Sequence, residues 1–433
     1  LRLNHLFSDR LFSNTSAIFS NYNYRINVDM SNGNNMSIIS RIQDYSFKQD
    51  FQFFISENST LKYGFNSVYH KIIPGAIKAG ENISLKSLSN KNAWENTLYL
   101  SMEDKFSEKL SLEYGLRLNA FSLLGPGDFY SYDALGNKTD TLRVGAGKFV
   151  KTYFNLEPRA SLNYMLDANS SVKMSYARNT QNLHLLSNTT SGSPTDLWIP
   201  SSNNVKPEMA DQFSLGYYRN FDDDLYEFSA EVYYKNLQNQ IDYKDGADLN
   251  YNENVESLIL PGKGRAYGLE LFLKKKQGQF NGWISYTLSR TERKFDGINH
   301  GNYYPAKQDR THDISVVGMY KLDKRWTFSA TWVYNTGNAV TFPCGKYEMD
   351  GQTMFYYTDR NANRMPAYHR LDLGATLTSS EHSSWSFSLY NAYGHDNAYM
   401  ILFRDKKSDP TKTEAVQTTL FKYIPSVSYN FKF

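Results

Sequence analysis

The stretch "LYEFSAEVYYKN", residues 225–236, alternates apolar and polar residues over the length of a strand. One face of the extended chain carries Tyr226, Phe228, Ala230, Val232 and Tyr234. The other face carries Glu227, Ser229, Glu231, Tyr233 and Lys235. The apolar face has aromatic residues at both ends and a small residue at its centre. This is the pattern of a strand that faces lipid between two aromatic girdles.

The same alternation recurs along the 433-residue chain, for example in "RWTFSATWVYN" at 325–335 and "LSLEYGLRLNA" at 110–120. No run of about 18 apolar residues exists, so the sequence predicts no transmembrane helix. Strands that cross a membrane escape a hydropathy scan because only every second residue faces lipid. The 34 tyrosines and 27 phenylalanines suit strands and interfacial girdles. These features predict an all-β protein, a transmembrane antiparallel β-barrel.

The connections between the alternating segments fall into two classes. Short polar turns are expected near 8–10, 56–60, 107–109, 167–170, 222–224, 277–280, 323–325 and 380–384. Longer connections are expected near 73–93, 124–150, 186–208, 243–263, 294–309, 337–367 and 404–416. Short and long connections alternate almost strictly, as in an outer-membrane barrel with periplasmic turns and long extracellular loops. The alternation weakens over 36–55 and 385–403, where bulges are expected.

The strand count is about 17, and the first residues, "LRLNHLFSDR", alternate from the start. Bacterial barrels have an even number of strands. Residues 1–433 are therefore expected to form the C-terminal part of a transmembrane β-barrel, with the first strands and any plug domain outside this segment. A barrel of this width is either a channel or is plugged.

Composition and motifs argue against several classes of function. The 47 basic and 44 acidic residues nearly balance and form no basic stripe, so no nucleic-acid partner is expected. The single cysteine, Cys344, allows no internal disulfide. No motif of a hydrolase, metalloprotease or nucleotide-binding enzyme occurs, and no cluster suggests a metal. We expect neither an enzyme nor a cofactor.

A set of charged residues falls on the polar phase of the predicted strands. These residues are Glu113, Arg117, Glu157, Arg159, Glu227, Glu231, Glu270 and Arg370. Inward charges need water or partners. They either line an aqueous pore as ordinary wall residues or contact a folded plug.

Aromatic residues are frequent in the predicted outer loops. They are Trp198, Tyr251, Tyr303, Tyr304, Phe355, Tyr356 and Tyr357. Aromatic rings stack on planar or sugar-like ligands and also anchor loop packing. The sequence offers these residues as candidate ligand contacts, with loop packing as the alternative for each.

Several segments together resemble the barrel of a TonB-dependent receptor. They are "LEPRASLNY" (156–164), "NVKPEMADQFSLGYYRNF" (204–221), "GRAYGLELFLKK" (264–275), "YPAKQDRTHDISVV" (304–317), "YNTGNAVTFP" (334–343), "MPAYHRLDLG" (365–374) and the terminal "PSVSYNFKF". They occur in order over 150–433 and are similar to members from Bacteroidetes. The resemblance is weaker over 1–149.

The resemblance implies a 22-stranded barrel in the outer membrane of a Gram-negative bacterium, surrounded by lipid and lipopolysaccharide. It implies a plug domain inside the barrel and energy supplied by TonB, ExbB and ExbD through an N-terminal segment that this chain does not show. A surface lipoprotein partner stays open. The terminal Tyr429, Phe431 and Phe433 resemble the signal read by the barrel-assembly machinery.

The expected function is therefore a receptor that binds a scarce nutrient on its outer loops and imports it with TonB. Two alternatives stay open, namely a non-transporting adhesin or structural barrel and a passive porin. The sequence does not select the nutrient, because siderophore, haem, cobalamin, oligosaccharide and peptide all suit an aromatic-rich mouth.

Overall fold

The fold is all-β, as the alternation predicts. The computed structural model describes residues 1–433 except 29–35, 80–82, 88, 187–196, 248–253 and 351. Its main sheet contains 19 strands, and leaving out the short β5 (Ile83–Ser87) and β18 (Tyr304–Pro305) gives 17 wall strands among the described residues. This number agrees with the count of about 17 that the sequence predicts. No helix in the described part of the chain is long and apolar enough to cross a membrane.

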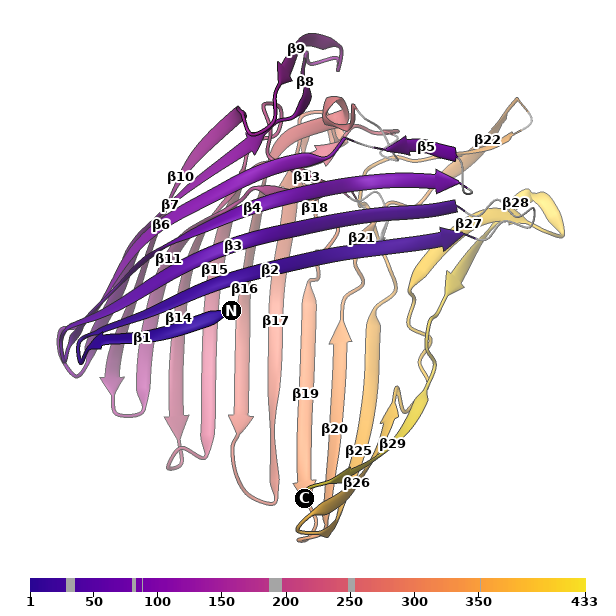
Figure 1. The fold of residues 1–433 in the computed structure, drawn as a ribbon. Coiled ribbons are helices and arrows are strands. Elements are labelled where there is room, and N and C mark those ends of the chain that lie inside the picture. Colours follow the sequence, from indigo (N-terminus) through magenta and orange to yellow (C-terminus); the bar gives the residue numbers. More distant parts are fainter. Residues whose placement is uncertain (29–35, 80–82, 88, 187–196, 248–253, 351) are drawn as a thin grey trace.

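Each wall strand pairs in antiparallel fashion with the next one along the chain. The wall strands are β1 (Arg2–Ser8), β2 (Leu11–Val28), β3 (Met36–Ser56), β4 (Ser59–Ala79), β6 (Lys91–Lys105), β7 (Leu110–Leu124), β10 (Phe149–Asp167), β11 (Ser170–Gln181), β14 (Glu208–Phe221), β15 (Tyr226–Tyr243), β16 (Ile259–Lys275), β17 (Phe280–Lys294), β19 (His312–Lys321), β20 (Trp326–Asn335), β25 (Tyr368–Ser380), β26 (Ser383–Tyr390) and β29 (Ile424–Phe431). Among the described strands, β1 pairs only with β2 and β29 only with β26. The sheet is thus a curved wall that does not close on itself (Figure 1).

The longer connections gather at one end of the wall, and their described residues form what we call the cap: residues 125–148, 182–186, 197–207, 244–247, 254–258, 295–311, 336–350, 352–367 and 391–423. Their short elements are β8 (Gly127–Tyr132), β9 (Lys138–Val144), β12 (Leu183–Leu186), β13 (Leu197–Pro200), the 3-10 helices η1 (Val255–Leu258) and η2 (Asn299–Gly301), β18, β21 (Ala339–Val340), β22 (Gly345–Met349), β23 (Gln352–Tyr356), β24 (Asn363–Arg364), β27 (Met400–Lys406) and β28 (Asp409–Thr418). In Figure 1 the β8–β9 hairpin projects beyond the wall strands.

All eight predicted short turns are found at the opposite end of the wall. The turn between β14 and β15 shows how the sequence makes one of them. Asp222, Asp223 and Asp224 all have positive φ, between 49° and 63°. The backbone N–H of Leu225 donates to the carbonyl of Asp222 at 2.9 Å. Aspartate tolerates this conformation better than most residues, so three in a row mark a tight reversal.

Two of the predicted connections are wrong in extent. The expected loop at 73–93 begins too early, because β4 continues to Ala79. Its Pro74 and Gly75 stand opposite the single residue Ser40 in a bulge of the β3–β4 ladder. A bulge tolerates proline, which cannot donate to the ladder. The sequence predicts a bulge within 36–55; the ladder is irregular there at residues 39–41, but the extra residue lies on β4.

The C-terminal connection is the second correction. The sequence predicts a long connection near 404–416, preceded by weak alternation with bulges over 385–403. In the structure β26 ends at Tyr390, and residues 391–423 form one long connection that contains the β27–β28 hairpin. This hairpin alternates like a wall strand, but it pairs with itself and lies in the cap. Alternation alone does not tell which partner a strand takes.

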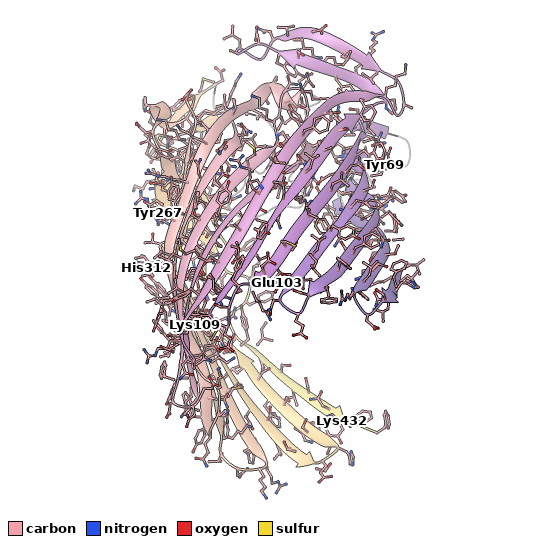
Figure 2. The ribbon with its side chains drawn as sticks, turned by 90° about the vertical axis from the view of Figure 1, so that its left-hand side faces the viewer. Tyr69, Glu103, Lys109, Tyr267, His312 and Lys432 are labelled. Atoms are coloured by element: carbon pink, nitrogen blue, oxygen red, sulfur yellow. The ribbon has the colours of Figure 1, made fainter. Side chains whose placement is uncertain are left out.

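The two faces of the wall differ as the sequence predicts. On β7, Tyr114, Leu116 and Leu118 are 42%, 45% and 39% exposed and share one face. Tyr69 and Tyr267 also lie on the outward phase of their strands and are labelled in Figure 2. Exposed aromatic and leucine side chains cover this face of strand after strand, whereas polar side chains occupy the other face. This apolar face is the lipid-facing surface.

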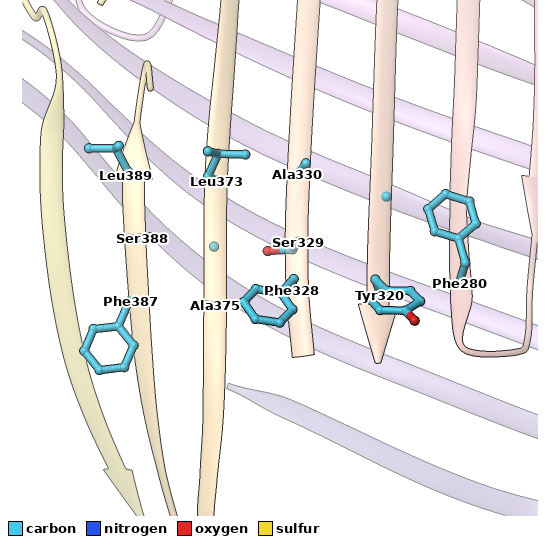
Figure 3. A pocket seen from close by; sticks show the side chains of 12 residues that line it. Phe280, Tyr320, Phe328, Ser329, Ala330, Leu373, Ala375, Phe387, Ser388 and Leu389 are labelled. Carbon is cyan, nitrogen blue, oxygen red and sulfur yellow. The ribbon is translucent and has the colours of Figure 1, made fainter. Parts of the chain in front are cut away.

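Shallow grooves mark the lipid-facing surface where small residues lie between large ones. One groove of about 500 Å³ runs across β17, β19, β20, β25 and β26. Figure 3 shows Tyr320, Phe328 and Phe387 on the lower side of it and Leu373 and Leu389 on the upper side, with the small Ala330 beside Leu373. This arrangement follows the pattern of aromatic ends and a small centre seen in the sequence.

The buried apolar clusters lie in the cap and at the outer ends of the strands beneath it. Leu186, Leu197, Ile199, Val205, Ile241 and Val255 form the first cluster. Phe295, Ile298 and Tyr304 form the second. The wall is held by its backbone ladder and the cap by its own side-chain packing.

Candidate ligand-binding site

A pocket opens in the cap between the β8–β9 hairpin, β13, η1 and the outer end of β6. Its volume is about 560 Å³. It is lined by Pro74, Ser89, Lys91, Gly127, Asp128, Phe129, Tyr130, Tyr132, Leu197, Trp198, Ile199, Pro200, Asn203, Val255 and Glu256. Four of these side chains are aromatic, and Lys91, Asp128 and Glu256 are charged. Pockets of this size and mixture are typical of small-ligand sites.

The β8–β9 hairpin, which carries three of the four aromatics, is shaped by its turn. The Asp133 carboxylate accepts hydrogen bonds from the backbone N–H groups of Leu135 and Asn137, at 2.9 and 2.8 Å. The Asn137 bond holds the pKa of the Asp133 carboxyl below its usual value. Gly136 follows with φ of 90°, which favours glycine. The turn thereby fixes the register that sets Phe129, Tyr130 and Tyr132 beside the pocket.

Cations lie over the aromatic rings of this hairpin. The Lys91 ammonium lies 4.6 Å from the centroid of the buried Phe129 ring. The Lys138 ammonium lies 3.6 Å from the Tyr130 ring. Tyr130 and Tyr132 contact each other edge to face, with centroids 6.4 Å apart. Cation–π and edge contacts hold the rings in defined orientations before any ligand arrives.

Glu256 is the main acidic group of the pocket, and its carboxylate is firmly held. Ser202 Oγ donates to it at 3.0 Å and Asn204 Nδ2 at 2.5 Å. The same Asn204 amide donates to the carbonyl of Tyr130 at 2.8 Å, which ties η1 to the β8–β9 hairpin. Burial, together with the nearby Glu256 charge, raises the pKa of Tyr132 to about 12. The Tyr132 hydroxyl is protonated and donates to Asn254 Oδ1 at 3.3 Å.

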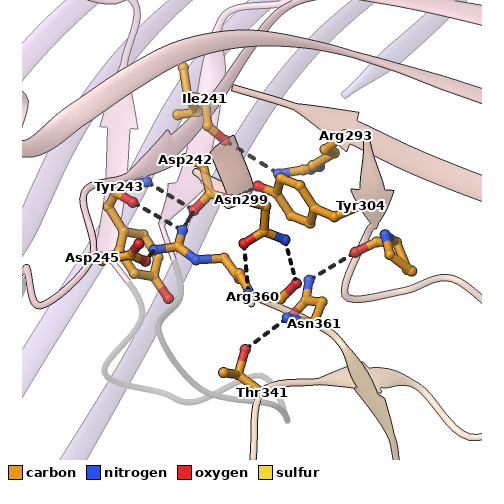
Figure 4. A network of polar contacts seen from close by, with 11 residues as sticks. Ile241, Asp242, Tyr243, Asp245, Arg293, Asn299, Tyr304, Thr341, Arg360 and Asn361 are labelled. Carbon is orange, nitrogen blue, oxygen red and sulfur yellow. Dashed lines mark hydrogen bonds and ion pairs between the residues drawn. The ribbon is translucent and has the colours of Figure 1, made fainter. Parts of the chain in front are cut away.

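The rest of the cap is clamped by one arginine. Arg360 donates to Asp242 at 2.6 Å and to the carbonyl of Tyr243 at 2.9 Å. It also pairs with Asp245. Asn299 donates to the carbonyl of Arg360 and accepts from its N–H, at 2.9 and 2.7 Å. Figure 4 shows how this network joins three connections of the cap.

The predicted loop aromatics are not brought together. Of the six that the structure describes, Trp198 alone lines the pocket. Tyr304 is 3% exposed and donates to Asp242 at 2.7 Å, so it packs within the cap. The Tyr303 ring lies 4.3 Å from the Arg265 guanidinium. Phe355, Tyr356 and Tyr357 lie on or just beyond β23, away from the pocket. Tyr251 lies outside the described residues.

The predicted inward charges all lie on the phase opposite the lipid-facing side chains. Arg117 is directly opposite Glu157, which is only 4% exposed. The Glu157 carboxylate lies 3.5 Å from Arg117 and 3.8 Å from Arg159. Arg370 pairs with Asp372 at 2.8 Å. Glu227 lies 3.8 Å from Lys276.

Three glutamates of this set lie directly across a strand pair from another carboxylate. Glu231 faces Glu270, and Glu113 faces Glu103. Tyr218 donates to Glu231 at 2.8 Å. Directly opposed like charges destabilise a ladder unless water or a partner separates them. These positions suit a wetted inner face.

Sequence reasoning missed a polar ladder on the inner face. His70 Nδ1 lies 2.8 Å from Asp44, and His70 Nε2 lies 3.8 Å from Glu95. Asn119 donates to Glu95 at 2.6 Å and accepts from Asn182 at 3.1 Å. The ladder links four wall strands to the start of the β12–β13 connection. These residues share the polar phase of their strands, which is the signal that could have found them.

The pocket aromatics Phe129, Tyr130 and Tyr132 were also missed. They lie in "GDFYSY" at 127–132, inside a predicted loop. The pairing of β8 with β9 brings them beside Trp198. The loop sequence has no periodicity from which this pairing could be predicted.

The family is shown by sequence. The model of the "TonB dependent receptor-like, beta-barrel" family matches residues 1–392, and the chain belongs to this family. It is an outer-membrane protein. A comparison with curated protein sequences gives no match. The predicted similarity to Bacteroidetes members remains a prediction.

Solved structures show the same fold at low identity. The siderophore receptor PiuA from Acinetobacter baumannii matches with a TM-score of 0.65 and 15% identity over 100% of this chain and 63% of that chain. The ferric-catecholate import receptor Fiu from E. coli K12 gives 0.62 and 14%, with the same shares. The ferric yersiniabactin uptake receptor FyuA from Yersinia pestis gives 0.62 and 14%, over 99% of this chain and 60% of that chain. This chain therefore spans less than two thirds of the length of these receptors.

Proposed function

We propose that this chain is the barrel part of a TonB-driven importer that captures a scarce nutrient in the cap pocket. The observation that carries the proposal is the 560 Å³ aromatic pocket at the extracellular end of a wall that belongs to the TonB-dependent receptor family. The pocket offers ring faces, a lysine, a fixed carboxylate and a protonated tyrosine hydroxyl. Such a site suits a small ligand with planar or apolar faces and a few polar groups.

The cargo is not assigned by the fold. The matched receptors are no more than 15% identical to this chain, which supports a shared fold and no shared ligand. Of the seven aromatics predicted from the sequence, the proposal uses Trp198. The other described ones stay candidates for contacts of a larger ligand or for loop packing. The inward charges are proposed to face a plug domain or the water around it.

The test measures uptake by the full-length receptor in cells with and without TonB. Labelled ferric siderophores, haem, cobalamin, oligosaccharides and peptides are supplied separately. We expect one class to accumulate only when TonB is present. Trp198→Ala should lower its uptake at limiting concentration by roughly tenfold, because a stacked ring contributes on the order of 1 kcal/mol or more. Trp94→Ala is the matched control, since Trp94 lies on the lipid-facing phase of β6 and is 40% exposed.

Uptake that survives loss of TonB would identify a passive porin. Surface binding without accumulation of any class would identify an adhesin or structural barrel. Equal losses for Trp198→Ala and Trp94→Ala, after correction for protein abundance, would remove the pocket from the proposal while leaving import intact.

A further inference from the structure

Two arginines on the lipid-facing surface share one buried carboxylate. Arg265 Nε and Arg290 Nε each lie 2.7 Å from a different oxygen of Glu292. The Glu292 side chain is 5% exposed, whereas those of Arg265 and Arg290 are 38% and 56% exposed. Among the described residues, the terminal guanidinium nitrogens of both arginines have no hydrogen-bond partner. The carboxylate fixes the two guanidinium groups at their Nε atoms. The Tyr303 ring lies 4.3 Å from the Arg265 guanidinium and covers one of its faces, so the terminal N–H groups at its edge remain available as donors.

The register places this group on the outward face. Arg265 is opposite Glu292, and Tyr267 is opposite Arg290 on the same phase. Next along the same phase come Leu269 and Leu288, also directly opposite each other. Beyond the two leucines, the lipid-facing phase therefore continues with Tyr267 opposite Arg290 and then with Arg265 opposite Glu292. Tyr267 is labelled in Figure 2.

Strand geometry gives the height of Arg265 and Arg290 above the end of the wall that carries the short turns. Arg265 is ten residues from Lys275, the last residue of β16 at the short-turn end. At about 3.3 Å per residue this is about 33 Å along the strand. A tilt of about 40° reduces it to about 25 Å, the height of the apolar band of an outer-membrane barrel. Arg265 and Arg290 thus lie where hydrocarbon ends and the headgroups of the outer leaflet begin.

The local charge is positive. Lys263 lies directly opposite Lys294 on the same phase, just beyond Arg265 and Glu292. At this end of the outward phase of β16 and β17, four cations thus accompany one carboxylate. Directly opposed lysines are unfavourable unless an anion lies between or beside them.

A second arginine on the same face provides a contrast. Arg178 pairs with Asp211 through two bonds of 2.7 and 3.0 Å. Tyr176 and Gln238 also donate to Asp211, at 2.7 and 2.8 Å. Here one cation meets one anion and the charge is balanced. The positive excess on β16 and β17 is therefore not repeated at this site on β11 and β14.

We propose that Arg265 and Arg290, supported by Lys263 and Lys294, bind the phosphate of an anionic lipid in the outer leaflet. A fixed pair of guanidinium groups matches the geometry of phosphate oxygens. A lipid is the occupant because the donors point outward, next to the apolar band, where acyl chains can lie on Leu269 and Leu288 while the phosphate meets the arginines.

The experiment uses the full-length receptor in detergent and measures binding of lipid A bisphosphate and of dephosphorylated lipid A by native mass spectrometry. The test variant is R265Q/R290Q/E292Q, which removes both donors without leaving a buried carboxylate unpaired. The control is Lys275→Gln, on the same strand and phase at the other end of the band. Inorganic phosphate is added as a competitor.

The wild type should prefer the phosphorylated lipid by about 10-fold or more, since a hydrogen bond to a charged group contributes about 1.5–3 kcal/mol. The triple variant should lose this preference and K275Q should keep it. The proposal is overturned if the wild type shows no preference, if the triple variant keeps it, or if millimolar inorganic phosphate displaces the lipid completely, which would indicate a site for free phosphate. Heat-modifiable migration in gels confirms that each variant is folded.

Discussion

The wall and the cap of this protein are built on opposite principles. In the wall, large apolar side chains such as Leu116 and Leu118 are 45% and 39% exposed, and a continuous backbone ladder holds the strands together. In the cap, apolar side chains such as Val205 and Ile298 are 1% and 0% exposed, and ion pairs bind the loops to one another. The difference teaches that the solvent of each region decides which side chains are hidden. Lipid solvates the wall, and water forces the cap to build a core.

The largest expected effect tests the wall. Leu288 and Thr287 are neighbours on β17 at one depth but on opposite faces. Leu288→Arg places a charge in the middle of the apolar band and should lower the free energy of unfolding by about 2–4 kcal/mol. Thr287 lies opposite Glu270 on the inner face, so Thr287→Arg should change the free energy of unfolding by less than about 1 kcal/mol. Denaturant titration in phospholipid vesicles measures both, and equal losses would break the distinction between the two faces.

A smaller effect is expected in the cap. Arg360 and Asp242 are 11% and 13% exposed, so Arg360→Ala leaves a mostly buried carboxylate without its cation. We expect a local loss of about 1.5–3 kcal/mol. Hydrogen exchange of residues 241–245 and 357–364 should then be roughly 10 to 100 times faster, with the wall strands unchanged.

Arg404→Ala sharpens this prediction as a control within the cap. Arg404 pairs with Glu414 at 2.8 Å, but the two side chains are 53% and 31% exposed. Exposed pairs contribute about 0–1 kcal/mol, so exchange should hardly change. If Arg404→Ala and Arg360→Ala had the same effect, the cap would not depend on the buried network of Figure 4.

The wall could be predicted from the sequence, because each strand reports its two faces directly. Alternation in segments such as 225–236 indicates the outward phase, and the eight turns follow from their polar residues. The error at 73–93 arose where Pro74 looked like the end of a strand but is absorbed by a bulge opposite Ser40. The error at 391–423 arose because the β27–β28 hairpin alternates without joining the wall.

The candidate site could be predicted only in part. The sequence predicts that aromatic residues of the outer loops contact the ligand, and one of them, Trp198, lines the pocket. Its companions Phe129 and Tyr130 come from a loop more than 60 residues earlier, and only folding of the cap brings them together. Loop residues have no fixed period, so their contacts depend on packing that the sequence does not display. The same reason explains why Tyr304, a predicted ligand contact, lies buried against Asp242.

A cysteine scan of β17, in the full-length receptor in intact outer membranes, tests most directly which face of the wall lipid covers. The exposed native thiol is first removed by Cys344→Ser, and residues 284–289 are then replaced by cysteine one at a time. Positions 284, 286 and 288 should react only with a membrane-soluble maleimide, and positions 285, 287 and 289 with a small water-soluble thiol reagent. Water-soluble labelling at all six positions, or labelling without a period of two, would contradict the claim that lipid covers one face of this wall and water the other.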